Sequence, residues 1–143
     1  MTVHLLKLSV GSESAESQAA WVKRRVAYNK KRKWGAVHDH TTRMFPRRRE
    51  ELLDGGSIYW VIKGVVLVRQ KILDLKSVTG ADGIERCAII LEPEIVATEA
   101  QPRRAFQGWR YLDPQDAPRD ASASGRDSAP PELRAELAEL GLL

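Results

Sequence analysis

Apolar and polar residues near the start of the chain predict a strand followed by a helix. Residues 3–10 alternate between the two kinds, as in a half-buried strand, and Gly11 ends the run. From a cap at Ser12 or Ser14, apolar residues then recur three or four positions apart as far as about Lys33. That spacing lines one face of an α-helix, and most of the basic residues fall on the other face and in the last turn.

A second strand and a shorter helix are expected next. Residues 37–45 can extend as a strand, and Pro46 suits the first turn of a helix because its missing N–H group costs nothing there. We predict this helix over residues 47–53. Gly55 and Gly56 then end it, since glycine adopts the left-handed cap without steric cost.

The middle of the chain is rich in β-branched and aromatic residues, which favour strands. Lys63 and Gly64 separate the two most apolar runs and predict a turn or bulge. Asp82 and Gly83 are typical of a tight turn into another strand. The strands predicted in this region are residues 57–62, 65–75, 84–91 and 95–98.

Together these elements predict an α+β fold, with two helices in the N-terminal half and either a mostly antiparallel sheet or a partly closed pseudobarrel. A chain of 143 residues suits one domain, which we place at residues 1–112. Residues 113–143 change to Asp, Pro, Ala, Ser and Gly, which bury too little apolar area to become ordered, so we expect a flexible tail. A short amphipathic helix in this tail has its apolar positions at Leu133, Leu137 and Leu140.

Positive charge is concentrated in one stretch of the chain. The net charge is only +4, yet residues 21–50 contain eleven basic side chains and two acidic ones. A concentrated positive field attracts polyanions whatever the fold, so the asymmetry is evidence about partners. The alternative for much of the cluster is a solvated helix face, on which the dipole favours cations near the carboxyl end.

Several functional classes find no support in the sequence. It contains no Gly-x-Ser-x-Gly elbow, no phosphate loop and no dinucleotide-binding glycine pattern. Residues 38–40 read His-Asp-His, but His4 is the only further imidazole, so we predict an exposed turn or strand edge, with no metal and no cofactor. Cys87 lies in an apolar run and is expected to be buried and inert.

The cysteine content and hydropathy predict a cytoplasmic protein. A single cysteine allows no internal disulfide, which favours a reducing compartment. We find neither a signal peptide nor an apolar run near the ~20 residues of a membrane span, so no membrane partner is expected.

Arginine and aromatic residues are interleaved in residues 102–112. Guanidinium groups can contact phosphates while aromatic rings offer flat surfaces on which bases stack. The residues of this segment that we assign to a nucleic-acid site are Arg103, Arg104, Gln107, Trp109, Arg110 and Tyr111. The alternative is that Phe106, Trp109 and Tyr111 are packing anchors that close the domain, with the arginines flanking them in solvent.

Further candidates surround the start of the predicted short helix. Arg43, Arg47 and Arg48 lie where free N–H groups and the positive end of the helix dipole favour an anion. A solvated helix face is the alternative for these arginines. Lys63 is a basic residue at the break between two central strands, and Trp60 offers a further ring for stacking.

Three segments carry a family resemblance. Residues 42–48, 50–64 and 106–112 read TRMFPRR, EELLDGGSIYWVIKG and FQGWRYL. They are similar to the signatures of an uncharacterised bacterial family, number 1489 of the domains of unknown function, and the likeness runs from Met1 to about Pro118. The family implies no activity, and this sequence departs from its pattern around residues 30–40 and in the tail.

More remotely, the strand, the Pro-started helix, the Gly-Gly stop and the apolar strand pair resemble the opening of PUA-like and ASCH-like pseudobarrels. This resemblance implies binding of RNA or modified bases. Because ASCH-like proteins include amidohydrolases of acylated nucleosides, it also implies Lys63 as activating base, Glu51 as its acid partner and Thr42 as a positioning hydroxyl. A fold alone does not fix a function.

Three hypotheses follow. The first is a noncatalytic nucleic-acid-binding module for RNA or for a modified or unpaired base. The second is a small amidohydrolase-like enzyme acting on nucleoside-type substrates, which requires Lys63 in a pocket beside a carboxylate. The third is a protein-interaction module that docks on its partner through the C-terminal helix.

Overall fold

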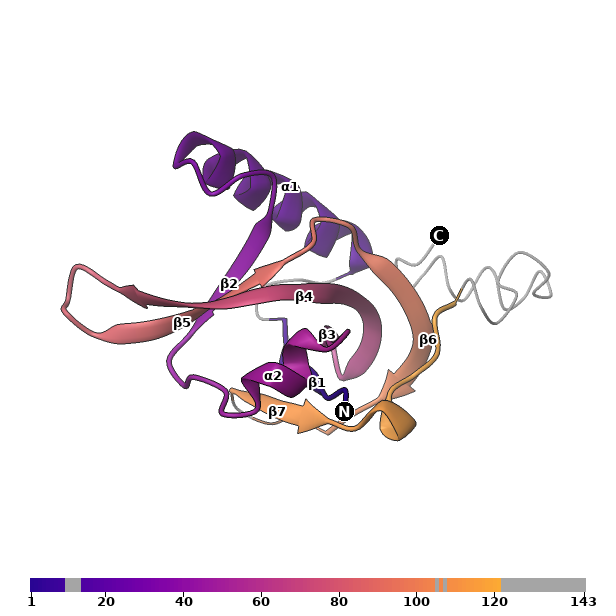
Figure 1. The fold of residues 1–143 in the computed structure, drawn as a ribbon. Helices are drawn as coiled ribbons and strands as arrows, with labels where there is room; N and C mark the ends of the chain where they lie inside the picture. Colours follow the sequence, from indigo (N-terminus) through magenta and orange to yellow (C-terminus); the bar gives the residue numbers. More distant parts are fainter. Residues whose placement is uncertain (10–13, 105, 107, 122–143) are drawn as a thin grey trace.

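The structure is a computed structural model that describes residues 1–9, 14–104, 106 and 108–121. Within these residues, two helices pack against a curved, open sheet of seven strands (Figure 1). The helices are α1 (Ala15–Lys31) and α2 (Arg49–Leu53), and a 3₁₀ helix, η1 (Pro114–Asp116), follows the last strand. The strands are β1 (His4–Leu8), β2 (His38–Thr42), β3 (Ser57–Ile62), β4 (Val65–Thr79), β5 (Glu85–Leu91), β6 (Val96–Pro102) and β7 (Trp109–Leu112).

The strands follow the order β2-β5-β4-β3-β1-β7, and β6 also pairs with β4. β1 and β3 run parallel, and the other neighbouring pairs are antiparallel. The predicted α+β class, the mostly antiparallel sheet and the two helices in the N-terminal half are therefore confirmed. The predictions did not include β7 or the parallel pairing of β1 with β3.

β4 is the strand around which the sheet is built. Its first half pairs with β3 and β6, and its second half pairs with β5. A register shift between Ile72 and Asp74 marks a bulge, and bulges bend the strand that carries them, in keeping with the curve of β4 in Figure 1. Lys63 and Gly64 make the predicted turn between β3 and β4, with φ angles of 51° and 79°. Two positive φ values give a turn whose twist matches that of the strands.

The two faces of the sheet carry separate apolar cores, because side chains alternate along each strand. The larger core lies on the face that α1 and α2 cover, and it includes Leu5, Leu52, Ile58 and Trp60. The second core lies on the opposite face and consists of Leu6, Tyr59, Val61, Val66 and Leu112. The candidate site described below lies on this second face.

α1 begins where the sequence predicted. Ser14 is its N-cap, and its Oγ accepts a 3.1 Å hydrogen bond from the backbone N–H of Ser17. Ala15 and Trp21 pack against the larger core, and Val22 is 3% exposed.

Residues 38–40 are largely buried, although the sequence predicted that they would be exposed, because α1 packs over β2. Asp39 is 1% exposed and accepts hydrogen bonds from Arg25 at 2.7 Å and from Asn29 at 2.9 Å. Burial alone would raise the pKa of Asp39, but the hydrogen bonds from Arg25 and Asn29 lower it below the ordinary value. Arg32 donates a further 3.1 Å bond to the same carboxylate. The prediction of a strand edge is correct, because β2 is the first strand in the sheet order, but the predicted exposure of residues 38–40 is wrong.

α2 is short, as predicted, but Pro46 is not in its first turn. The helix begins at Arg49, with Arg48 at the N-cap position. The predicted glycine stop is confirmed, since Gly55 has a φ of 80°. Gly56 is required for a different reason, because a Cβ there would overlap the carbonyl oxygens of Leu52 and Val3.

The chain continues beyond β7 along the outer edge of β6. The backbone N–H of Glu99 donates to the carbonyl of Arg119 at 2.8 Å, and that of Ala121 donates to Ala97 at 2.9 Å. Asp120 forms a bridge to Thr98 between these two bonds. Residues 119–121, which the sequence assigned to the tail, thus pair with the sheet, while the predicted helix through Leu133 lies outside the described residues.

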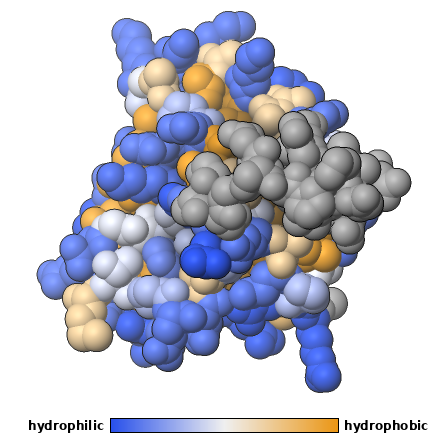
Figure 2. Space-filling view, turned by 90° about the vertical axis from the view of Figure 1, so that its right-hand side faces the viewer, coloured by the Kyte–Doolittle hydropathy of each residue, from blue (hydrophilic) through white to orange (hydrophobic). Residues whose placement is uncertain are grey.

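Hydrophilic side chains cover most of the described surface seen from the β6 side, with hydrophobic residues emerging between them (Figure 2). No helix in the described part of the chain combines the length and the hydropathy needed to cross a bilayer.

Candidate functional site

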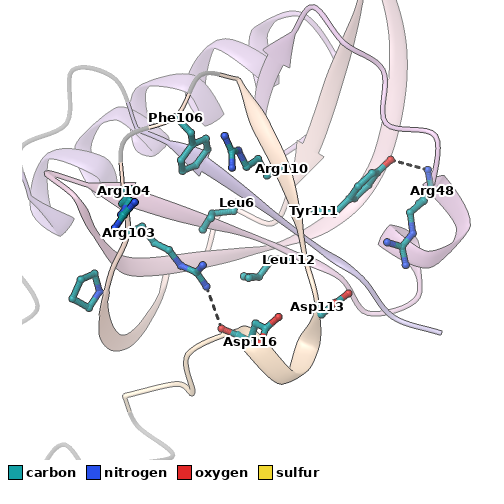
Figure 3. Close-up of a pocket in the computed structure, with 11 residues that line it drawn as sticks. Leu6, Arg48, Arg103, Arg104, Phe106, Arg110, Tyr111, Leu112, Asp113 and Asp116 are labelled. Atoms are coloured by element: carbon teal, nitrogen blue, oxygen red, sulfur yellow. Dashed lines mark hydrogen bonds between the residues drawn. The ribbon is translucent and has the colours of Figure 1, made fainter.

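A hollow of about 640 Å³ opens on the second face of the sheet. Its lining residues come mainly from the end of β6, the segment that follows β6, β7 and η1. Leu6 and Leu112 form its apolar floor, between the side chains of Phe106, Arg110 and Arg103 (Figure 3). The remaining lining residues are Arg48, Pro102, Arg104, Tyr111, Asp113 and Asp116.

The register between β1 and β7 places Arg110 over this floor. Arg110 pairs with Leu6, and Leu6 pairs with Tyr59 of β3, so the three share one face of the sheet. Trp109 and Tyr111 alternate to the opposite face, where they pack against the larger core. A four-residue strand therefore divides the aromatic and basic side chains that the sequence grouped together.

Three arginines around the hollow have no carboxylate partner among the described residues. Arg103 donates from Nε and Nη2 to Oε1 of Gln101, at 3.0 and 2.7 Å, and more weakly to the carbonyl of Asp116 at 3.4 Å. Arg104 and Arg110 are exposed, and no ion pair to a described residue holds either of them. Their positive charges are therefore available to an anion.

Phe106 adds an aromatic ring to the same hollow. It is half-buried and packs against the second core, and the guanidinium carbon of Arg110 lies 5.1 Å from its ring centroid. A guanidinium over an aromatic ring is held by the ring quadrupole, which orients the cation without neutralising it.

Arg48 and Tyr111 lie at the rim, on the far side of β7 from Phe106 (Figure 3). Arg48 forms two hydrogen bonds with Glu51, of 2.5 and 3.0 Å, and these lower the pKa of the Glu51 carboxyl. The hydroxyl of Tyr111 accepts hydrogen bonds from the backbone N–H groups of Arg47 and Arg48, at 2.9 and 3.1 Å. Both rim residues are therefore engaged in holding the loop before α2.

The predicted site residues that the structure describes divide into three groups, namely those in the hollow, those exposed outside it and two tryptophans that pack. The hollow brings together Arg48, Arg103, Arg104, Arg110 and Tyr111. Arg43, Arg47 and Lys63 are exposed outside it, and Gln107 lies outside the described residues.

Trp60 and Trp109 have packing roles in the structure. Trp60 is 1% exposed in the larger core, and its Nε1 donates to Oε1 of Gln70 at 2.9 Å, so no base can reach its ring. Trp109 donates from Nε1 to the carbonyl of Met44 at 3.0 Å and stands edge-on to Tyr111. The packing alternative is thus the one that describes Trp109.

Sequence reasoning missed two features of the hollow. Phe106 was not among the predicted site residues, yet its ring lines the hollow. Asp113 and Asp116 were assigned to the tail, but η1 brings them to the rim. The interleaved arginines and rings of residues 102–112 are the sequence signal that leads to the hollow. The alternation of side chains along a strand would have placed Arg110 on the opposite face from Trp109.

The described residues offer little for metal or nucleophilic chemistry. They contain no group of His, Cys, Asp and Glu that could hold a metal ion. Burial lowers the pKa of His38 and of His40 to about 4, so both are neutral, and each stands edge-on to the ring of Trp21. Cys87 is buried as predicted, and burial raises the pKa of its thiol to about 11.

Lys63 does not meet the requirement of the amidohydrolase hypothesis. It is exposed in the turn between β3 and β4, whereas an activating lysine needs a pocket that lowers its pKa. Glu51, its expected acid partner, is paired with Arg48. The amidohydrolase hypothesis therefore lacks the recessed lysine and the free Glu51 carboxylate that it requires.

The chain belongs to the family described as "Protein of unknown function (DUF1489)", which matches residues 5–143. The family resemblance found in the sequence is thereby confirmed, and it extends beyond the predicted limit at about Pro118 to residue 143. No curated protein and no solved structure shows significant similarity to the chain.

Proposed function

We propose that this member of the DUF1489 family is a noncatalytic module that binds single-stranded nucleic acid, RNA or an unpaired or modified base, in the hollow beside β7. The observation that carries the proposal is the position of Arg103, Arg104 and Arg110. Their unneutralised guanidinium groups surround an apolar floor and one aromatic ring.

The chemistry of the hollow suits a base with its phosphates. A volume of about 640 Å³ falls within the range typical of small-molecule sites. The base stacks against Phe106 and covers Leu6 and Leu112, while Arg103, Arg104 and Arg110 contact the flanking phosphates. Stacking and guanidinium contacts are the two terms that dominate single-strand binding.

A single strand fits this arrangement better than a duplex. In a duplex the bases are paired and stacked, so an aromatic ring recessed beside an apolar floor has no base to contact. The resemblance to PUA-like domains stays a prediction, and it points to the same class of ligand. A cytoplasmic location is likewise part of the proposal, since RNA is abundant there.

One alternative remains outside the described residues. The interaction hypothesis depends on Leu133, Leu137 and Leu140. It is compatible with nucleic-acid binding, because the two hypotheses assign their roles to different segments of the chain.

Fluorescence anisotropy with labelled single-stranded RNA tests the proposal. The double variant Arg104→Gln/Arg110→Gln should bind at least about tenfold more weakly, and Phe106→Leu should lose about 1 to 2 kcal/mol, the scale of one base stack. Phe106→Tyr keeps the ring and should bind like the wild type. Lys71→Gln is the matched control, since it removes an exposed cation of β4 outside the hollow.

Circular dichroism of each variant shows whether the fold is retained. Equal affinity of the wild type and the folded arginine double variant for single-stranded RNA would falsify the proposal. A loss of the same size in Lys71→Gln would show that the binding is not located in the hollow.

A further inference from the structure

The outward face of α1 forms a second basic surface, on a different element from the hollow. α1 buries only Gln18, Val22 and Asn29 among its described side chains. The exposed basic residues on the helix and just after it are Lys23, Arg24, Lys30, Lys31 and Lys33. We refer to these five as the α1 basic surface.

The charge of this surface is not neutralised by its neighbours. No acidic residue occurs from residue 17 to residue 38. Asp39 follows, but it is buried and engaged by Arg25 and Arg32. No ion pair joins the five basic residues to an acidic residue in the described part of the chain.

The aromatic residues at the end of α1 are already occupied by cations. The guanidinium carbon of Arg32 lies 3.3 Å from the ring centroid of Trp34 and 4.7 Å from that of Tyr28. The ammonium of Lys76, from β4, lies 4.5 Å from the Trp34 ring. Arg32 is in turn fixed by Asn29 and Asp39, at 2.7 and 3.1 Å. Among the described residues, the Trp34 and Tyr28 rings are each faced by two cations, whereas the Phe106 ring is faced by one.

Two exposed alanines lie beside the basic pairs of α1. Ala27 lies between the pairs 23–24 and 30–31, and Ala20 lies one turn before the first pair. The pairs are seven residues apart, about 10 Å at 1.5 Å per residue. A ridge with small residues beside its charges can approach an extended anionic surface closely.

We propose that the α1 basic surface binds the sugar–phosphate backbone of a nucleic-acid duplex. A duplex presents dense phosphate charge with its bases inaccessible, which matches a surface that offers cations and little free stacking area. A membrane matches it less well, because interfacial helices place free Trp, Phe or Leu side chains beside their basic residues, whereas here the guanidinium of Arg32 faces the rings of Tyr28 and Trp34. The proposal does not depend on the hollow.

Anisotropy with a labelled duplex DNA and a labelled single strand tests the proposal on the full chain. The triple variant Lys23→Gln/Lys30→Gln/Lys31→Gln should bind the duplex at least about tenfold more weakly at low salt, and its log–log salt slope should be shallower by about 2.7, at about 0.9 for each phosphate contact. Its affinity for the single strand should stay within about twofold of the wild type. The variant Arg104→Gln/Arg110→Gln is the control and should bind the duplex normally.

Two results would overturn the proposal. The first is equal duplex affinity of the wild type and the triple variant, with helix content unchanged by circular dichroism. The second is tighter binding of the wild type to phosphatidylserine vesicles than to the duplex, with the triple variant losing the vesicle binding. Loss of duplex binding in the triple variant supports the α1 basic surface even if the hollow binds no single strand.

Discussion

Arg69 and Asp120 are joined by two hydrogen bonds of 2.7 Å each, one from Nε and one from Nη2. Their side chains are 23% and 29% exposed, so the pair is partly shielded from water. Arg69 lies on β4, whereas Asp120 lies at the end of the described chain. The pair therefore ties residues 119–121 to the sheet and, through them, helps to hold η1 at the rim of the hollow.

Breaking this pair should loosen the segment after β7. Asp120→Asn removes the charge and one acceptor of the paired hydrogen bonds. We expect the free energy of unfolding to fall by about 1 kcal/mol, which is the upper end of the range measured for exposed ion pairs. Hydrogen exchange should accelerate at the amides of Glu99 and Ala121, which donate across this edge. Arg119→Gln is the control, because its 3.6 Å pair with Glu99 is more exposed, and it should change stability by less than about 0.5 kcal/mol. Unchanged exchange in Asp120→Asn would show that the pair does not hold the segment.

The same pair has a defined dependence on pH. The hydrogen bond from Arg69 lowers the pKa of Asp120 below its ordinary value. Its contribution is therefore complete above the unfolded pKa, about 4, and is lost as the pH falls through the folded value. The protection of the Ala121 amide, measured as its exchange rate relative to the intrinsic rate at the same pH, should fall in that acidic window in the wild type. Asp120→Asn should not show this additional loss of protection.

Gly56 should tolerate no side chain. A Cβ there overlaps two backbone carbonyl oxygens, so Gly56→Ala must displace α2 or β1, and we expect a loss of about 3 kcal/mol in urea unfolding. Gly55→Ala is the matched control one residue away. Its φ is 80° and its Cβ meets nothing, so only the left-handed strain of about 1 kcal/mol applies. Equal losses in the two variants would contradict the close approach at Gly56.

His38, which is buried, and His40, which is partly buried, should make the fold sensitive to mild acid. Burial lowers the pKa of His38 and His40 to about 4, below the unfolded value of about 6.5. The unfolded chain then binds more protons between these values, so stability is complete above about pH 6.5 and falls as the pH approaches 4. At pH 5 we expect a loss on the order of 1 to 2 kcal/mol for each histidine, measured by urea unfolding.

A variant at one of these positions isolates the cause. His40→Gln should remove about half of the difference in unfolding free energy between pH 7 and pH 5. If stability is constant over this range in the wild type, the two imidazoles are not held neutral by burial.

Local patterns predicted most of the elements correctly, because each depends on residues close together in the chain. Ser14 caps α1, Lys63 and Gly64 turn between β3 and β4, and Gly55 ends α2. β7 could not be found in this way, since its partner β1 lies about a hundred residues earlier and its four residues were interpreted through their charge and aromaticity.

The candidate site was only partly predictable for the same reason. Arg103, Arg104 and Arg110 were correctly grouped, since they lie in one short segment. The apolar floor needs the pairing of β1 with β7, and no local pattern in Leu6 or Leu112 indicates it. Trp60 was misassigned because its burial depends on Gln70 and α1, neither of which is close to it in the sequence.

The salt dependence of single-stranded RNA binding tests the central claim most directly. The log–log slope counts phosphate contacts, at about 0.7 for each contact on a single strand. We predict that the slope for Arg104→Gln/Arg110→Gln is shallower than that of the wild type by about 1.4. This variant should also bind more weakly at every salt concentration, while Lys71→Gln follows the wild type. Superimposable slopes and affinities for all three proteins would contradict the assignment of the hollow as a nucleic-acid site.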